Sequence, residues 1–139
     1  ERAGSEVVYY GKNGYSPYDM NVSRMDSHGG WIATPSDLLR FSAHVDSFSS
    51  TPDILQANTI KNMTAPGAVN PSYACGWSVN QSQNWWHIGS LPGLTSILVR
   101  AANGLSTASI ANTYKNGMET EIDRMMWRMV KAIPAWRAS

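Results

Sequence analysis

The sequence predicts an α+β fold in which an antiparallel meander of about four strands packs against a C-terminal helix, after an excursion of helices and loops over about residues 12–66. Asn103-Gly104 lies between two apolar runs and is the strongest short-range signal of a hairpin, with a tight primed turn that needs positive φ at both residues. Apolar residues recur at helical spacing after Gly117. A chain of 139 residues suits a single domain, which we place over residues 1–139.

The N-terminal region is expected to be mostly irregular. Residues Glu6–Gly11 (EVVYYG) are typical of a short strand. Residues 12–30 are rich in Gly, Asn, Ser, Asp and Pro and show neither helical nor strand periodicity, which predicts a loop. A loop of this length in a compact domain is usually functional or contacts a partner.

Two helices are predicted in the rest of the excursion. Thr34 can cap a helix whose first residue is Pro35, and Asp37 lies at the position that completes a capping box. Apolar residues follow at helical spacing, namely Leu38, Phe41 and Val45. A second, shorter helix is expected from about Ile54 to Met63.

The meander and the last helix are predicted over residues 73–133. Its four strands are expected at Tyr73–Val79, Trp85–His87, Leu94–Arg100 and Leu105–Asn112, with a break at the Gly/Pro loop Gly89–Gly93.

The C-terminal helix is the clearest amphipathic segment, and Pro134 ends it. Its apolar face, which we interpret as core, consists of Met118, Ile122, Met125, Met126, Met129, Val130 and Ile133. Small residues on the preceding strand (Ala108, Ser109 and Ala111) should let this helix approach one face of the sheet closely.

Composition argues against several classes of function. The net charge is +1 and no run of Lys or Arg stands out, so nucleic acid is not an expected partner. No apolar run approaches the ~20 residues that span a bilayer. Cys75 is the single cysteine, and His28 and His44 have no partners at metal-ligand spacing, so neither a metal nor another cofactor is predicted.

Residues 87–96, HIGSLPGLTS, follow two tryptophans and resemble the third motif of the serine β-lactamase and penicillin-binding-protein-like hydrolases. That motif is Lys-Thr-Gly in many members and His-x-Gly in the esterase and D-peptidase branches. Four further features fit the class C β-lactamase branch in the right order. They are GGWIATPSDLLRF (29–41), YACGW (73–77), SIANT (109–113) and a tryptophan in the middle of the C-terminal helix. The resemblance covers nearly all of residues 29–133.

Two motifs of that family are absent from the sequence. No Ser or Thr is followed three residues later by Lys, so the Ser-x-x-Lys nucleophile is missing. The one Tyr-x-Asn, residues 114–116, comes after the third motif instead of before it and is interpreted as a chance match. We therefore expect the C-terminal portion of such a hydrolase, an incomplete β-lactamase-like fold that is inactive alone. A chain that begins Glu-Arg-Ala-Gly, without Met, also suggests a piece of a longer polypeptide.

The resemblance implies roles for three catalytic candidates. His87 would line the cleft and orient the nucleophile's general base or a polar group of the substrate. Gly89 lets the backbone pass close to a substrate, and the N–H of Ser90 would be one of two oxyanion-hole donors. The alternatives are a histidine merely hydrogen-bonded at a strand end and a simple turn over Gly89–Gly93.

Three further residues are candidates for substrate binding. Ile88 replaces the usual Thr or Ser of the motif and cannot donate a hydroxyl hydrogen bond, which favours an ester or an amide with an uncharged group. Asn112 matches a position near a carboxylate-binding region, but it is equally a good turn residue. Trp86 can stack on a ligand or belong to the core.

The expected substrate is a small ester, amide, β-lactam or peptide, and the family suggests a periplasmic or secreted location. In the family the last strand pairs with an N-terminal strand, so we expect the edge at Leu105–Thr113 to be covered by the missing N-terminal portion or by a second copy of the chain. The alternative function is a non-catalytic module that binds a glycan or peptidoglycan fragment. A purely structural or decayed fragment is the third alternative.

Overall fold

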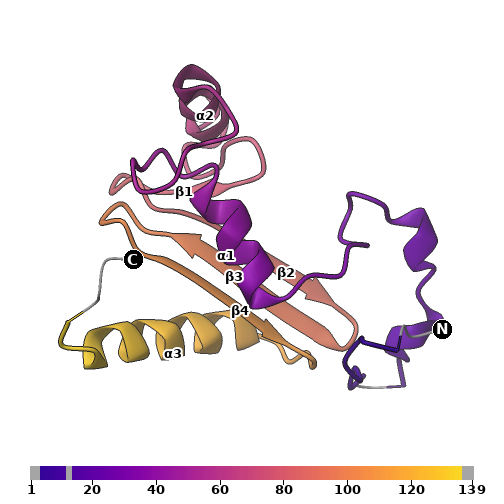
Figure 1. The fold of residues 1–139 in the computed structure, drawn as a ribbon. Coiled ribbons are helices and arrows are strands. Elements are labelled where there is room, and N and C mark those ends of the chain that lie inside the picture. The colour runs from indigo at the N-terminus through magenta and orange to yellow at the C-terminus, as the bar shows by residue number, and fades with distance from the viewer. Residues whose placement is uncertain (1–3, 12–13, 136–139) are drawn as a thin grey trace.

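The computed structural model describes residues 4–11 and 14–135 and confirms an α+β fold with a four-stranded antiparallel sheet and a C-terminal helix. The sheet has the meander order β1-β2-β3-β4 (Figure 1). The elements are η1 (Pro17–Asp19), η2 (Val22–Arg24), α1 (Pro35–Ala43), α2 (Ala57–Thr64), β1 (Ser78–Val79), β2 (Trp85–Leu91), β3 (Leu94–Arg100), β4 (Ser106–Ala111) and α3 (Met118–Ala132).

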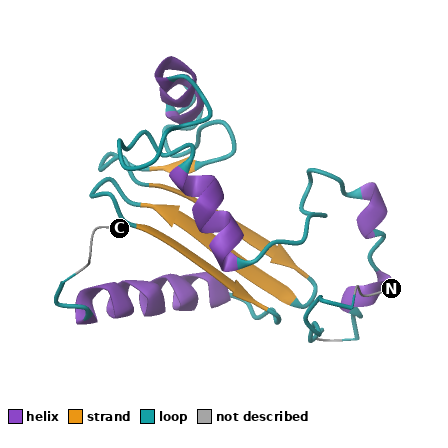
Figure 2. Cartoon of the chain, in the orientation of Figure 1, coloured by secondary structure: helices purple, strands orange, loops and turns teal. Residues whose placement is uncertain are grey.

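Helices cover both faces of the sheet. Helix α1 contacts β4 and β3 on one face, where Leu38 packs against a core that includes Leu98. Helix α3 contacts β3 on the other face, where Ile122 packs with Ile97 and Val99. Because side chains alternate along a strand, Ile97 and Leu98 belong to different cores. The described residues before α1, 4–11 and 14–34, extend beyond the tip of the β2–β3 hairpin as loops and short helices (Figure 2).

The predicted start of α1 is confirmed. The Thr34 side chain accepts a hydrogen bond from Asp37 N at 3.2 Å, and Asp37 Oδ2 accepts one from Thr34 N at 2.9 Å. Helix α2 begins at Ala57, three residues later than expected. Ile54 N donates instead to His44 O at 2.9 Å, which holds this segment against the end of α1.

The expected break of β2 at Gly89 is wrong. Gly89 and Ser90 pair in register with Ser96 and Thr95, so the strand continues to Leu91. Only Pro92-Gly93 forms the turn. Gly93 has φ +77°, which a type II turn with proline at its second position requires at its third.

The hairpin at Asn103-Gly104 is confirmed, but its primed turn is not. Only Gly104 has positive φ (+91°). Gly104 N donates to Ala101 O at 3.2 Å and Ala101 N donates to Leu105 O at 2.8 Å, a pattern of a turn followed by a left-handed glycine bulge. Asn103 Oδ1 accepts from Leu105 N at 3.2 Å, which stabilises the longer loop.

Two predicted strands are shorter than expected. In the segment predicted as a strand at residues 6–11, only Tyr10 forms a bridge, a parallel one with Thr113. In the segment predicted at 73–79, only Ser78–Val79 is a strand. Gly76 has φ +80° and Ala74 N donates to Trp77 O at 2.8 Å, so this segment folds back on itself.

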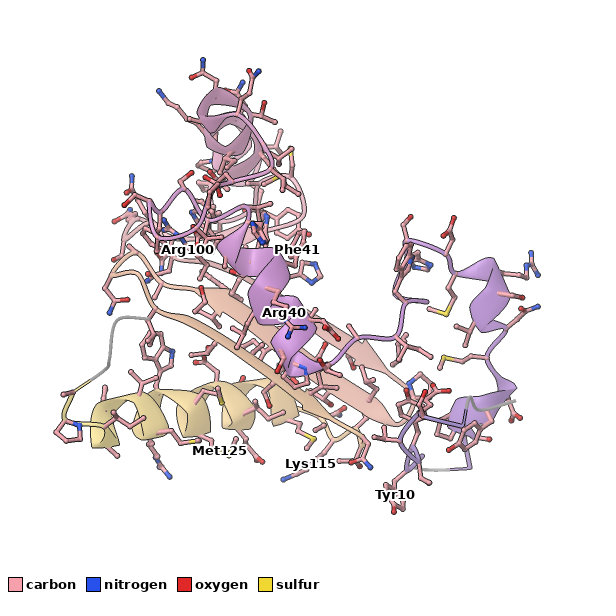
Figure 3. The ribbon with its side chains drawn as sticks, viewed as in Figure 1. Tyr10, Arg40, Phe41, Arg100, Lys115 and Met125 are labelled. Carbon is pink, nitrogen blue, oxygen red and sulfur yellow. The ribbon has the colours of Figure 1, made fainter. Side chains whose placement is uncertain are left out.

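Helix α3 has the predicted bounds, but its apolar face is only partly covered. Met118, Met126 and Trp127 pack around Ile122, whereas Met125, Met129 and Ile133 are 48%, 54% and 40% exposed. Figure 3 shows Met125 directed away from the sheet. Of the small residues on β4, Ala111 packs toward α3 while Ala108 packs toward α1, because strand alternation separates them.

Candidate functional site

The outer edge of β2 is unpaired beside His87, Ile88 and Gly89 in the described residues. Strand β1 pairs only with Trp85 and Trp86, and in the described part of the chain no strand flanks β2 beyond them. Leu91 and Leu94 close the hairpin turn and therefore exchange both of their backbone hydrogen bonds. Counting back by two from Leu91, Gly89 and His87 are hydrogen-bonded to β3 as well. The N–H and C=O groups of Ser90 and Ile88, which lie between them, therefore point away from β3, toward the edge where no described strand lies.

The side chains of this segment are divided between the two faces. His87 and Gly89 share the α1 face with Trp85, and Ile88 and Ser90 lie on the α3 face. His87 is exposed, and its ring makes no hydrogen bond to any residue that the structure describes. The imidazole is therefore free to meet a ligand or a partner.

Gly89, which shares a face of the sheet with His87, leaves room for the Ser96 side chain on the neighbouring strand. A Cβ added there would collide with the side-chain oxygen of Ser96 on the neighbouring strand, so the hydroxyl would have to rotate away. The Ser96 hydroxyl thus occupies the space above Gly89 on the face that His87 shares.

The three substrate-binding candidates are not brought together. Ile88 lies on the open strand and is 44% exposed, whereas Trp86 is half-buried and packs into the core under α3. Asn112 lies past the end of β4, on the opposite edge of the sheet. Its Nδ2 donates to Val8 O at 2.8 Å and its carbonyl accepts from Tyr10 N at 3.0 Å. In this structure, Asn112 anchors the N-terminal segment.

A cavity of about 410 Å³ adjoins the hairpin tip. It is lined by Tyr15, Ser90, Leu91, Pro92, Gly93, Tyr114 and Asn116. The sequence analysis missed it, although the signal was the Tyr-x-Asn at 114–116 that was interpreted as a chance match. The Tyr114 hydroxyl donates to Asn116 Oδ1 at 2.8 Å, so the two side chains form one polar wall.

A second, shallower hollow of about 370 Å³ lies beside Gly30. Val22, Ser23, Asp26, Gly30 and Trp31 line it, and Trp31 is 79% exposed. A Cβ at Gly30 would lie 3.1 Å from the carbonyl oxygens of Val22 and Asp26, so a side chain there would crowd this turn.

A tyrosine pair supports the hairpin tip. The rings of Tyr9 and Tyr18 meet edge to face with centroids 6.1 Å apart, and Tyr9 N donates to the Tyr18 hydroxyl at 3.0 Å. Burial, the hydrogen bond to Glu6, the charge of Glu6 and the nearby Tyr18 raise the pKa of Tyr9 to about 12. Tyr9 therefore stays neutral across the physiological range, as a structural side chain.

No metal cluster or membrane span is found within residues 4–11 and 14–135. No three of their His, Cys, Asp and Glu side chains are placed to hold a metal ion. His44 Nδ1 instead lies 3.0 Å from Pro52 O. None of the described helices is both long and apolar enough to cross a bilayer.

No family model, no curated protein and no solved structure matches this chain. The open β2 edge and the cavity beside it are therefore the features from which a function can be inferred.

Proposed function

We propose that this chain is the C-terminal part of a β-lactamase-related serine hydrolase that cleaves an ester, an amide or a β-lactam through an acyl-enzyme. The chain supplies the His87-Ile88-Gly89 edge and one oxyanion donor, the N–H of Ser90. A separate stretch of polypeptide supplies the Ser-x-x-Lys nucleophile, so the chain alone is inactive.

The outward N–H of Ser90 is the observation that supports this proposal most. An oxyanion donor must be held rigidly yet be free of any partner in the resting protein. Within the described residues Ser90 meets both conditions, because its flanking residues Gly89 and Leu91 are hydrogen-bonded to β3 while its own amide points outward and meets no strand. One such donor contributes ~2.7–4 kcal/mol of transition-state stabilisation.

The neighbouring side chains fit an acyl-transfer site. The exposed imidazole of His87 can orient the general base or a polar group of the substrate. Gly89 carries no Cβ, so a substrate carbonyl can approach the strand when the Ser96 hydroxyl rotates away. The partly exposed methyl groups of Ile88 favour an uncharged acyl group over a carboxylate.

We propose that a partner polypeptide covers the free edge of β4. Alternation of the ladder directs the N–H and C=O groups of Ser106, Ala108 and Ile110 away from β3. The chain's own segment Val8–Tyr10 reaches only the end of this edge, at Asn112. Residues 105–114 carry neither charge nor proline, the usual protections of a bare edge. The nucleophile-bearing polypeptide, or else a second copy of the chain, would cover it.

The test is complementation. The chain alone should turn over neither nitrocefin nor p-nitrophenyl acetate, and co-expression with the polypeptide encoded immediately before it should restore hydrolysis. In the restored enzyme, Ser90→Pro removes the outward N–H without breaking a ladder hydrogen bond and should lower kcat by about 10²–10³-fold.

Ser90→Ala is the matched control, because it removes only the side-chain hydroxyl and keeps the outward backbone N–H. The proposal fails if the chain alone is active, if complementation restores nothing, or if the alanine variant loses as much activity as the proline variant.

A further inference from the structure

We infer that the cavity at the β2–β3 hairpin tip binds a neutral, hydroxyl-bearing ring such as a sugar residue. This inference concerns binding alone and holds whether or not a nucleophile is ever supplied to the β2 edge.

The chemistry of the lining selects an uncharged polar ligand. Its polar groups are two phenols, one aliphatic hydroxyl and one carboxamide, from Tyr15, Tyr114, Ser90 and Asn116. These groups both donate and accept hydrogen bonds, as the hydroxyls of a sugar require. Among the residues that the structure describes, no charged side chain lines the cavity, and the nearby Lys115 ammonium is paired with the Glu121 carboxylate at 3.2 Å.

The apolar part of the cavity lining also fits a sugar ring. Leu91 and Pro92 contribute an aliphatic wall, and the Tyr15 ring is 74% exposed. A flat aromatic ring offers a surface against which the C–H face of a sugar ring can pack, while its hydroxyl remains available for hydrogen bonding. The volume of about 410 Å³ lies within the ~300–1,000 Å³ of small-molecule sites.

The cavity is held in shape by buried contacts. Thr95 is fully buried, and its hydroxyl donates to Thr113 O at 3.0 Å, which ties the hairpin to the segment that carries Tyr114. On the other side Gly93 packs so closely that an added Cβ would lie 2.6 Å from Pro17 Cγ. The walls therefore need little rearrangement to accept a ligand. Figure 3 shows Tyr10 and Lys115 at this end of the sheet, both directed outward from it.

The proposal is tested by titrating N-acetylglucosamine and its β-1,4-linked trimer into the whole chain while recording ¹H–¹⁵N NMR spectra. The backbone amides of Ser90 and Asn116 and the side-chain amide of Asn116 should shift with a dissociation constant of about 1 mM, a binding free energy of about −4 kcal/mol. Tyr15→Ala should weaken binding about tenfold, a change of ~1.4 kcal/mol.

Tyr73→Ala is the matched control, since Tyr73 is also partly exposed but does not line the cavity. It should bind as the wild type does. The inference is overturned if these amides do not shift at sugar concentrations well above about 1 mM, if both tyrosine variants weaken binding equally, or if N-acetylmuramic acid, which carries a carboxylate, binds more tightly than the neutral sugar. Because binding is read without turnover, these outcomes are independent of the complementation test.

Discussion

The guanidinium carbon of Arg100 lies 4.1 Å from the ring centroid of Trp85, its direct partner across the β2–β3 ladder. On its other side the Phe48 ring centroid is 3.9 Å away. Nε and Nη2 of Arg100 donate to Asp46 O at 3.1 and 2.7 Å, and Nη1 donates to Gln83 O at 3.1 Å. Arg100 thus joins two loops, residues 44–56 and 80–84, to the end of the sheet opposite the hairpin tip that carries the cavity.

Arg100→Lys should destabilise the chain by about 2 kcal/mol, because an ammonium cannot stack flat between two rings or reach both carbonyls at once. Burial lowers the pKa of Arg100 and outweighs the charges of Asp46 and Asp53, which raise it. Urea denaturation measures the change. Arg40→Lys is the control, since Arg40 is exposed and its one ion pair among the described residues is with Asp37 at 3.3 Å. A surface pair contributes ~0–1 kcal/mol. Equal losses for the two variants would contradict the role given to Arg100.

The capping box of α1 predicts a loss of stability in acid. Hydrogen bonds from the Thr34 backbone and side chain, with a smaller contribution from Arg40, lower the pKa of Asp37 below 3.8. A carboxylate whose pKa is depressed by folding stabilises the fold above its unfolded pKa, and this contribution disappears as pH falls through the folded pKa. Asp37→Asn should therefore be less stable than wild type at pH 7, and the difference should shrink below about pH 3.8. Thermal unfolding across pH is the measurement, and a difference independent of pH would contradict the prediction.

The α1 cap shows what local sequence can predict in this protein. Thr34, Pro35 and Asp37 specify the helix start through contacts within four residues, and the structure confirms it. The periodicity of α3 predicted its bounds equally well. The hairpin turn at Asn103-Gly104 was misassigned, because the Asn103 side chain competes for Leu105 N and favours a bulged loop over a primed turn.

Features that depend on distant contacts were not predictable. Gly89 and Ser90 look like loop residues, but seven continuous pairs with β3 hold them in a strand. The cavity joins Tyr15, the hairpin tip and Tyr114, three segments far apart in the sequence. His87, Ile88 and Gly89 lie close together in the fold because they are consecutive in the sequence, whereas Asn112 lies on the other edge of the sheet.

The raised pKa of Tyr9 predicts that the fold loses stability at alkaline pH. Its pKa rises from 10.0 to about 12 on folding, chiefly through burial and then through Glu6. A group whose pKa is raised by folding stabilises the fold below its unfolded pKa, and this contribution is lost as pH rises through the folded value. The chain should thus lose stability between pH 10 and about pH 12. Tyr9→Phe should show a smaller loss over that window, measured by urea unfolding at each pH; an unchanged loss would contradict the assignment.

The open edge of β4 predicts an alternating pattern of hydrogen exchange. In the chain alone, the amides of Ala108 and Ile110 should exchange quickly because they point outward, whereas those of Thr107 and Ser109 should be protected by bonds to β3. A partner strand on this edge would slow exchange at Ala108 and Ile110 without changing exchange at Thr107 and Ser109.

Native-state exchange followed by NMR at increasing chain concentration distinguishes the two partners. A second copy of the chain protects Ala108 and Ile110 by self-association, whereas a nucleophile-bearing polypeptide protects them only when it is added. Protection of Ala108 and Ile110 in a dilute, monomeric chain would show that the edge is already covered and would remove the argument for a partner there.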